Sequence, residues 1–191
     1  MLISSRIAGG LAAVALALAT AAAPAGAQIT QPRNTKEFGL DAGLVVGLGD
    51  ISSVQIALPT ARARIGYFLA NDSRWSLEPA VGLNYIKVEG GDGALFYNLE
   101  AGALYHFAPP SGLMDVAEAN RVSVVYARPF INLSGVTGDG GDSEFSAGGG
   151  LGVKIPWRSG LAWRLEANAG YGFDNEAFRL GAFAGISFFT R

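Results

Sequence analysis

Residues 161–173 read Leu-Ala-Trp-Arg-Leu-Glu-Ala-Asn-Ala-Gly-Tyr-Gly-Phe, with an apolar side chain at every odd-numbered position. The even-numbered positions hold small or polar residues, among them Arg164 and Glu166. A period of two places alternate side chains on opposite faces of an extended chain, whereas a helix repeats its apolar residues every three or four positions. The stretch therefore predicts a β-strand with one apolar face and one mixed polar face.

The same alternation recurs from residue 38 to the end of the chain, and no charged residue lies on the apolar faces. Turn-forming clusters such as Asn71-Asp72-Ser73 separate the segments, and such short connections require antiparallel neighbours. Only the 108–120 connection is longer. Pro79 and Pro129 lie inside segments, where each removes a hydrogen-bond donor and predicts a bulge or irregular pairing. The eight segments are 38–47, 60–69, 75–85, 95–107, 125–134, 145–157, 161–173 and 178–189.

The composition excludes several classes of protein. Half of the 191 residues are hydrophobic and only 16% are charged, which excludes a disordered polar chain. The absence of Cys excludes disulfides, Cys-ligated zinc and iron–sulfur clusters. A formal net charge of -2 gives no electrostatic reason to expect a nucleic-acid partner. Beyond residue 27, no run approaches the roughly 18 apolar residues that a transmembrane helix needs.

Residues 1–27 have the features of a secretory signal peptide. A positively charged start precedes the apolar stretch 7–20, and Ala25 and Ala27 form the small-residue pattern of a cleavage site. We predict cleavage after Ala27. The alternative is a retained N-terminal anchor helix, which the short apolar core and Pro24 disfavour.

Eight alternating strands fit two closed architectures. A soluble, lipocalin-like barrel turns its apolar face inward around a ligand, whereas an outer-membrane barrel turns it outward to lipid. Glycines such as Gly66, Gly102 and Gly152 gather on the mixed polar face. Glycine weakens a strand by roughly 0.5–1 kcal/mol relative to Ala, so a water-facing surface has no reason to collect it. A narrow interior needs small residues beside bulky ones, and this favours the outer-membrane barrel.

Aromatic residues of the apolar face gather near the strand ends, and the strand middles are mostly Ala, Leu, Val and Ile. Two aromatic girdles around an aliphatic band are typical of a protein that crosses both membrane interfaces. The predicted girdle residues are Trp75, Tyr85, Tyr97, Tyr105, Phe107, Phe145, Trp157, Trp163, Tyr171, Phe173, Phe178 and Phe188.

Residues 78–85 (Glu-Pro-Ala-Val-Gly-Leu-Asn-Tyr) and 128–135 (Arg-Pro-Phe-Ile-Asn-Leu-Ser-Gly) resemble strands of the small outer-membrane β-barrels of the OmpA/OmpX kind. The resemblance implies an all-β, closed, eight-stranded antiparallel up-and-down transmembrane β-barrel at 38–191. A periplasmic segment at 28–37 would precede it, and both termini would lie in the periplasm.

The resemblance also implies the partners. They are outer-membrane lipid, lipopolysaccharide and the barrel-insertion machinery, which reads a terminal aromatic residue corresponding here to Phe188 or Phe189. We expect a monomer.

The inward face carries charges that must pair, because an isolated buried charge is costly. If the 108–120 connection is a simple hairpin, Glu100 lies roughly opposite Arg128. We expect the charges to form a ladder that blocks the lumen and holds the register of the strands. A narrow path for ions or small solutes along the same groups is the alternative. The predicted lumen charges are Asp41, Arg62, Arg64, Glu78, Glu100, Arg128, Lys154, Arg164, Glu166 and Arg179.

The sequence predicts no catalytic residue, metal site or cofactor. His106 is the single histidine and lies on the inward face toward the periplasmic end, whereas lipid-modifying barrels place a His and a Ser near the outer rim. Acidic residues, including Asp142, Glu144, Asp174 and Glu176, are expected in outward loops. They would bind divalent cations that bridge to lipopolysaccharide or, as the lack of calcium-loop spacing favours, form ordinary solvated turns.

The sequence therefore predicts a non-catalytic outer-membrane barrel that contributes to membrane integrity or surface interaction. A narrow passive pore is the first alternative, and a lipid-modifying enzyme of the outer membrane is the second.

Overall fold

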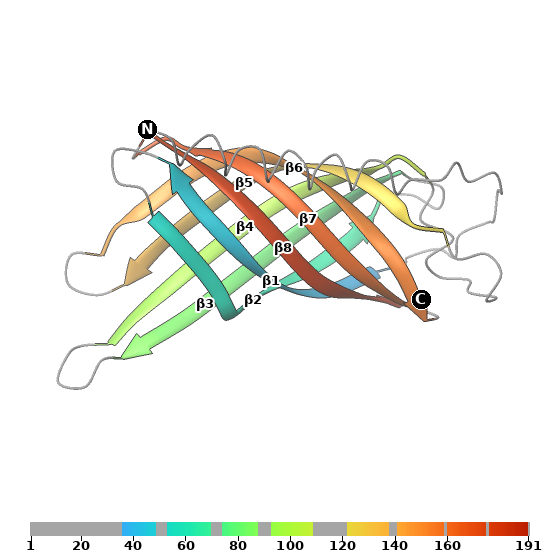
Figure 1. Ribbon diagram of the computed structural model, residues 1–191, viewed down its shortest axis with the longest axis horizontal. Coiled ribbons are helices and arrows are strands. Elements are labelled where there is room, and N and C mark those ends of the chain that lie inside the picture. Colours follow the sequence, from blue (N-terminus) through green and yellow to red (C-terminus); the bar gives the residue numbers. More distant parts are fainter. Residues whose placement is uncertain are drawn as a thin grey trace, which may run out of the picture.

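The computed structural model of the chain describes residues 36–48, 53–69, 74–87, 93–108, 122–137, 141–158, 160–174 and 176–190. Each strand pairs antiparallel with the next, and β8 pairs with β1, so the sheet closes into a barrel (Figure 1). The expected all-β, eight-stranded antiparallel barrel is confirmed. Its strands are β1 (Lys36–Leu48), β2 (Ser53–Phe68), β3 (Trp75–Lys87), β4 (Gly93–His106), β5 (Val124–Thr137), β6 (Ser143–Arg158), β7 (Leu161–Gly172) and β8 (Ala177–Thr190).

The described chain begins and ends at the same end of the barrel, because Lys36 at the start of β1 pairs with Thr190 at the end of β8. We call this the terminal end, and it lies to the right in Figure 1. The opposite end, where Leu48 pairs with Phe178, is the distal end. The predicted signal peptide at 1–27 and residues 109–120 of the long connection lie outside the described residues. Within those residues, no helix is long and apolar enough to cross a membrane.

Several strands begin earlier than the alternation predicts, and β2 differs the most. β1 begins at Lys36 rather than at residue 38, and β2 begins at Ser53 rather than at residue 60. The β1–β2 register shifts between Asp41 and Gly43, so Asp41 pairs with Arg62 and the next pair is Gly43 with Ala57. A single alternating pattern cannot run through such a shift. The irregular stretch around residues 58–60 interrupts the alternation, so the sequence pattern did not predict the first part of β2.

Pro79 and Pro129 do not produce the expected bulges. The β3–β4 ladder runs through Pro79, and the β5–β6 ladder runs through Pro129, without a shift of register. On the other side of each proline, the described pairs of β2–β3 and β4–β5 have a gap. Because proline lacks an N–H group, it loses pairing toward one neighbour and keeps it toward the other. Besides the shift in β1–β2, a register shift occurs in β6–β7, between Pro156 and Arg158.

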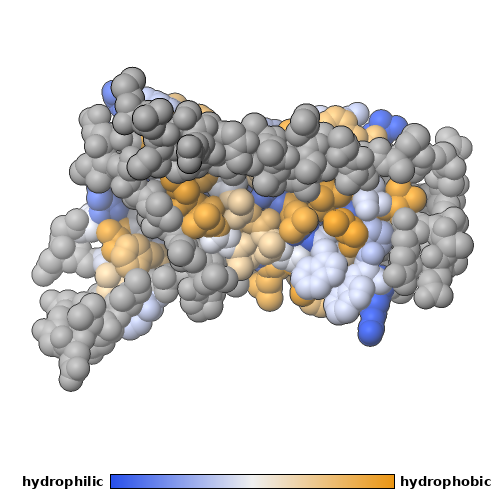
Figure 2. Space-filling model, in the orientation of Figure 1, coloured by the Kyte–Doolittle hydropathy of each residue, from blue (hydrophilic) through white to orange (hydrophobic). Residues whose placement is uncertain are grey.

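The apolar face of the sheet points outward. Leu83 is 59% exposed and Leu99 is 48% exposed, whereas Arg64 is 2% exposed and Glu100 is 7% exposed. In Figure 2, hydrophobic side chains occupy the middle of the visible wall and hydrophilic ones lie toward its two ends. A soluble carrier would have the reverse arrangement, so the facing predicted from the glycines and aromatics is confirmed.

Inward-facing glycines make room for the large side chains of the lumen. A Cβ on Gly102 would lie 2.7 Å from Nε of Arg128, and one on Gly39 would overlap the guanidinium of Arg64. A Cβ on Gly152 would meet the ring of Tyr126 and would lie 2.8 Å from the carbonyl oxygen of Leu165. Around these three glycines the interior is therefore filled to the point where even a methyl group must displace a neighbour.

Replacing one of these closely packed inward glycines should destabilise the barrel, and replacing an outward glycine should not. We expect Gly152→Leu to lower the free energy of unfolding by about 1–3 kcal/mol or more, because overpacking forces neighbours from their positions. Gly149→Leu is the matched control on the same strand, because nothing lies within 4 Å of a Cβ there. Urea unfolding of the refolded proteins in lipid vesicles, followed by Trp fluorescence, measures both. Equal losses of stability would contradict the assignment of the faces.

Candidate functional site

Ten charged side chains fill the lumen from near the terminal end to the middle of the barrel. Five are carboxylates and five are cations, and none is more than 7% exposed. Together they come from β1 to β7, so the set spans nearly the whole circumference. We call this set the lumen ion network, and its members are Glu37, Asp41, Arg62, Arg64, Glu78, Glu100, Arg128, Lys154, Arg164 and Glu166.

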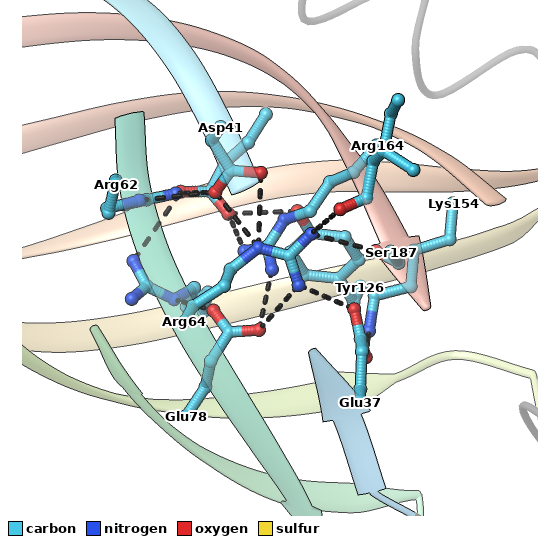
Figure 3. Close-up of polar contacts among 12 residues, drawn as sticks. Glu37, Asp41, Arg62, Arg64, Glu78, Tyr126, Lys154, Arg164 and Ser187 are labelled. Carbon is cyan, nitrogen blue, oxygen red and sulfur yellow. Dashed lines mark hydrogen bonds and ion pairs between the residues drawn. The ribbon is translucent and has the colours of Figure 1, made fainter. Parts of the chain in front are cut away.

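Arg64 joins three carboxylates and lies at the centre of Figure 3. Its Nη1 is 2.6 Å from Oε1 of Glu37 and 3.4 Å from Oε2 of Glu78, and its Nε is 2.9 Å from Oδ2 of Asp41. Its Nη2 donates a hydrogen bond of 2.8 Å to the hydroxyl of Ser187. One guanidinium from β2 therefore links β1, β3 and β8, and its fork of donors suits this use.

Glu78 of β3 extends the network across the lumen. Its Oε2 is 2.6 Å from Nη1 of Arg164, and its Oε1 is 3.0 Å from Nε of Arg128. Because Glu78 also contacts Arg64, three guanidinium groups share one buried carboxylate. One carboxylate cannot neutralise three guanidinium groups. The further negative charges come from Glu37, Asp41, Glu100 and Glu166.

Glu166 of β7 holds the part of the network nearest the middle of the barrel. Its carboxylate pairs with Arg164 and lies 3.4 Å from Nη2 of Arg62 and 3.5 Å from Nη1 of Arg128. It also accepts a hydrogen bond of 2.8 Å from the hydroxyl of Tyr126. The ring of Tyr126 lies 4.8 Å from the guanidinium carbon of Arg164, so an aromatic face covers part of that cation.

His106 lies at the terminal side of the network. Its Nδ1 is 3.0 Å from the backbone oxygen of Arg74, and its Nε2 is 3.2 Å from Nζ of Lys154, which also pairs with Glu37. The imidazole is fully buried. In the part of the chain that the structure describes, no group of three or more His, Cys, Asp or Glu residues is placed to hold a metal ion. The contacts of His106 are therefore those of a packed lumen residue.

The structure brings together all of the predicted lumen charges except Arg179. That residue pairs with Glu144 nearer the distal end, away from the network. Sequence reasoning missed one member, Glu37, because the barrel was expected to begin at residue 38. The signal was present, since Glu37 continues the alternation that places Asp41 inside.

Two expectations about the charges are wrong. Glu100 pairs in register with Asn132, not with Arg128, although the long side chain of Arg128 still reaches the Glu100 carboxylate. Glu144 is not in an outward loop: it belongs to β6 and is 6% exposed inside the barrel. Its place one residue before the apolar Phe145 puts it on the inward face by the same alternation.

The expected loop carboxylates also include Asp142, Asp174 and Glu176, which are exposed at the distal end. Oδ1 of Asp142 accepts a hydrogen bond of 2.8 Å from the backbone N–H of Ser143. Oδ2 of Asp174 accepts one of 2.9 Å from the N–H of Phe145. These two carboxylates therefore cap backbone groups at the turns, as side chains of solvated turns do.

The predicted girdle residues lie at both ends of the outer face. At the terminal end, the ring centroids of Trp75 and Tyr105 are 5.0 Å apart and those of Trp157 and Trp163 are 5.6 Å apart. Tyr67 also lies there and is exposed on the outer face, although it was not among the girdle residues predicted from the sequence. The structure places Phe107 and Phe188 with this group, and it places Tyr85, Tyr97, Phe145, Tyr171, Phe173 and Phe178 toward the distal end.

Between the network and the distal end, the lumen contains a cavity of about 520 Å³. We call it the distal cavity. Arg62 and Glu100 of the network reach it from one side, and Glu144 and Arg179 line it nearer the distal end. Its other inward-facing lining residues are Val45, Gly82, Phe96, Asn98, Phe130, Asn132, Ser134, Val136, Ser146, Asn168, Gly170 and Phe183.

The solved structures that are similar to this barrel include the following two. The attachment invasion locus protein Ail of Yersinia pestis gives a TM-score of 0.51 at 10% sequence identity, over 83% of this chain and 100% of that one. Neisserial surface protein A (NspA) gives a TM-score of 0.52 at 18% identity, over 80% of this chain and 96% of that one. No protein-family model and no curated protein matches the sequence. The chain thus has the fold of the small eight-stranded outer-membrane barrels, and the predicted resemblance is confirmed at the level of fold.

Removing one carboxylate from the network should destabilise the whole barrel. We expect Glu78→Gln to lower the free energy of unfolding by about 3–5 kcal/mol, because three guanidinium groups would lose a buried counter-charge. Glu144→Gln is the control and should cost less than about 1 kcal/mol, since its partner Arg179 is partly hydrated. Unfolding of both variants in lipid vesicles tests this. Equal costs would show that the network has no special role in stability.

Proposed function

We propose that this protein is a non-catalytic barrel of the outer membrane that contributes to membrane integrity or surface interaction and whose lumen the ion network closes. In this proposal, the terminal end faces the periplasm and the distal end faces outward. The barrel is a monomer, and its partners are outer-membrane lipid, lipopolysaccharide and the insertion machinery.

The observation that carries the closed lumen is the balance of the network. Its five cations and five carboxylates contact one another within the lumen, from near the terminal end to the middle of the barrel. A permeant ion would have to separate these pairs, and an uncompensated buried charge costs several kcal/mol. An eight-stranded barrel is also only just wide enough for its own side chains. Both considerations favour a lumen that does not conduct.

Support for the membrane location comes from the outer face and from closure. Large apolar side chains cover the exterior, and a water-soluble monomer rarely exposes so extensive an apolar surface. Because β1 pairs with β8, the sheet has no open edge. The unpaired N–H and C=O groups of an open edge would find no hydrogen-bond partners in hydrocarbon. Of the two candidate terminal aromatics, Phe188 is exposed on the outer face, whereas Phe189 packs near Val124 and Ala162. We therefore assign the insertion signal to Phe188.

A conductance measurement tests the closed lumen. We expect the purified, refolded protein in planar lipid bilayers to give no stable unitary current steps, because the paired charges leave no hydrated path. A larger porin, inserted into the same bilayers, serves as the positive control for incorporation. Reproducible unitary steps from the wild-type protein would contradict the proposal. Steps whose size or ion selectivity changed in Arg62→Ala or Arg128→Ala would instead support a narrow pore through the network.

Placing a charged side chain on the outer face of the barrel tests whether that face is covered by lipid. Leu151 lies midway between the aromatic ends of β6 and is exposed on the outer face. Leu151→Arg should cost about 2–4 kcal/mol near the bilayer midplane and should impair insertion. Ser134→Arg is the control, because Ser134 lines the distal cavity. Heat-modifiable gel mobility and membrane fractionation report insertion. Normal insertion of Leu151→Arg would argue against a lipid-covered wall.

A further inference from the structure

The distal cavity has the size of a small-molecule site. Its volume of about 520 Å³ lies within the roughly 300–1,000 Å³ of known ligand pockets. Arg62 and Glu100, members of the ion network, reach it from the middle of the barrel. Nearer the distal end, the side chain of Arg179 is 33% exposed, so this part of the cavity meets solvent. A compound could therefore enter from the distal end without disturbing the network.

The charges that line the cavity are already paired. Arg62 lies 2.9 Å from Glu100 and 2.9 Å from Asp41, and Arg179 pairs with Glu144. The described lining thus holds two cations and two carboxylates and has no net charge. An ionic ligand would have to compete with these pairs and would lose its own hydration on entry. The lining therefore favours an uncharged ligand.

Amide and hydroxyl side chains give the wall its polar groups. Asn98, Asn168 and Ser134 line the cavity. A side-chain amide has both donors and an acceptor, and a hydroxyl can serve as either. The wall is therefore complementary to a ligand with hydrogen-bonding groups at its edges.

Aromatic rings supply the rest of the surface. Phe130 of β5 and Phe183 of β8 line the cavity, together with Phe96 of β4. The guanidinium carbon of Arg62 lies 4.4 Å from the centroid of the Phe183 ring, so the cation is partly covered by an aromatic face. Rings of this kind pack well against a flat apolar body. Apolar walls with a few placed polar atoms are typical of small-molecule sites.

We propose that the distal cavity binds a small uncharged compound with a flat aromatic body and hydrogen-bonding groups at its edges. This goes beyond the closed lumen of the proposed function. It depends only on the distal half of the barrel, and the conductance measurement does not decide it.

Binding can be measured with a defined probe. 4-Aminobenzamide is uncharged and flat and carries N–H donors at opposite edges of its ring. We would titrate it into the refolded full chain in detergent micelles, with the side-chain amides of asparagine labelled with ¹⁵N. Saturable shifts of the resonances of Asn98, Asn132 and Asn168, with a Kd of about 1 mM or tighter, are expected for a compound of this size.

A matched pair of variants locates the site. A Cβ on Gly82 would meet only Asn98 at 3.5 Å, so Gly82→Trp can place its indole in the cavity. The neighbouring Val81 points outward and does not line the cavity, and Val81→Trp adds the same ring to the lipid face. We expect Gly82→Trp to weaken binding at least tenfold and Val81→Trp to leave it unchanged. Heat-modifiable gel mobility shows that both variants are folded.

A matched pair of probes tests the chemistry. 4-Aminobenzoate keeps the size, the ring and the amino group but carries a negative charge at neutral pH, so it should bind at least tenfold more weakly than 4-aminobenzamide. Equal binding of the two probes would overturn the preference for an uncharged ligand. Binding unaffected by Gly82→Trp would place the probe in the micelle or on the wall. The absence of saturable shifts in the wild-type protein would leave the cavity to water alone and overturn the proposal.

Discussion

Charged side chains enclosed in a narrow lumen must neutralise one another, and much of this structure depends on that constraint. Eight strands leave little space inside, so water cannot hydrate each charge separately. The network meets the constraint with equal numbers of cations and carboxylates, nearly all of which contact more than one partner. Its contacts join residues that are far apart in the chain, such as Lys154 and Glu37, 117 positions apart. Such pairs exist only when the barrel is closed, so the network and the closure of β1 onto β8 support each other.

The same constraint explains the glycines. An arginine side chain is long and ends in a planar guanidinium group. A narrow barrel has room for several of them only where the adjacent inward positions hold glycine, which has no side chain. Gly39 and Gly102 provide that room beside Arg64 and Arg128. The cost of glycine in a strand is thereby offset by the contacts that the buried guanidinium groups make. This is why glycines and charges share one face of the sheet, while the outer face keeps the aliphatic and aromatic side chains that lipid requires.

The lumen is therefore divided into two parts with different consequences. From near the terminal end to the middle, it is filled with neutralised charge, which supports the proposal of a lumen that does not conduct. In the distal half, asparagine, serine and phenylalanine side chains replace most of the charges and leave a cavity. Arg62 and Glu100 mark the boundary, because they belong to the network and also line the cavity. The first part accounts for the proposed function, and the second provides a place where a ligand can bind.

The period of two, the number of strands, the outward direction of the apolar face and most of the charges inside could be predicted from the order of the residues. These follow from local chemistry, because alternation fixes which side of a strand each residue occupies. Which charges pair depends on the closed barrel, since arginine side chains cross the lumen and reach strands other than their neighbours. The structure also placed Glu37 in the network, moved Glu144 from a loop into the lumen and revealed the register shift that hid the start of β2. The distal cavity was equally invisible in the sequence, because an empty space depends on how side chains from many strands converge.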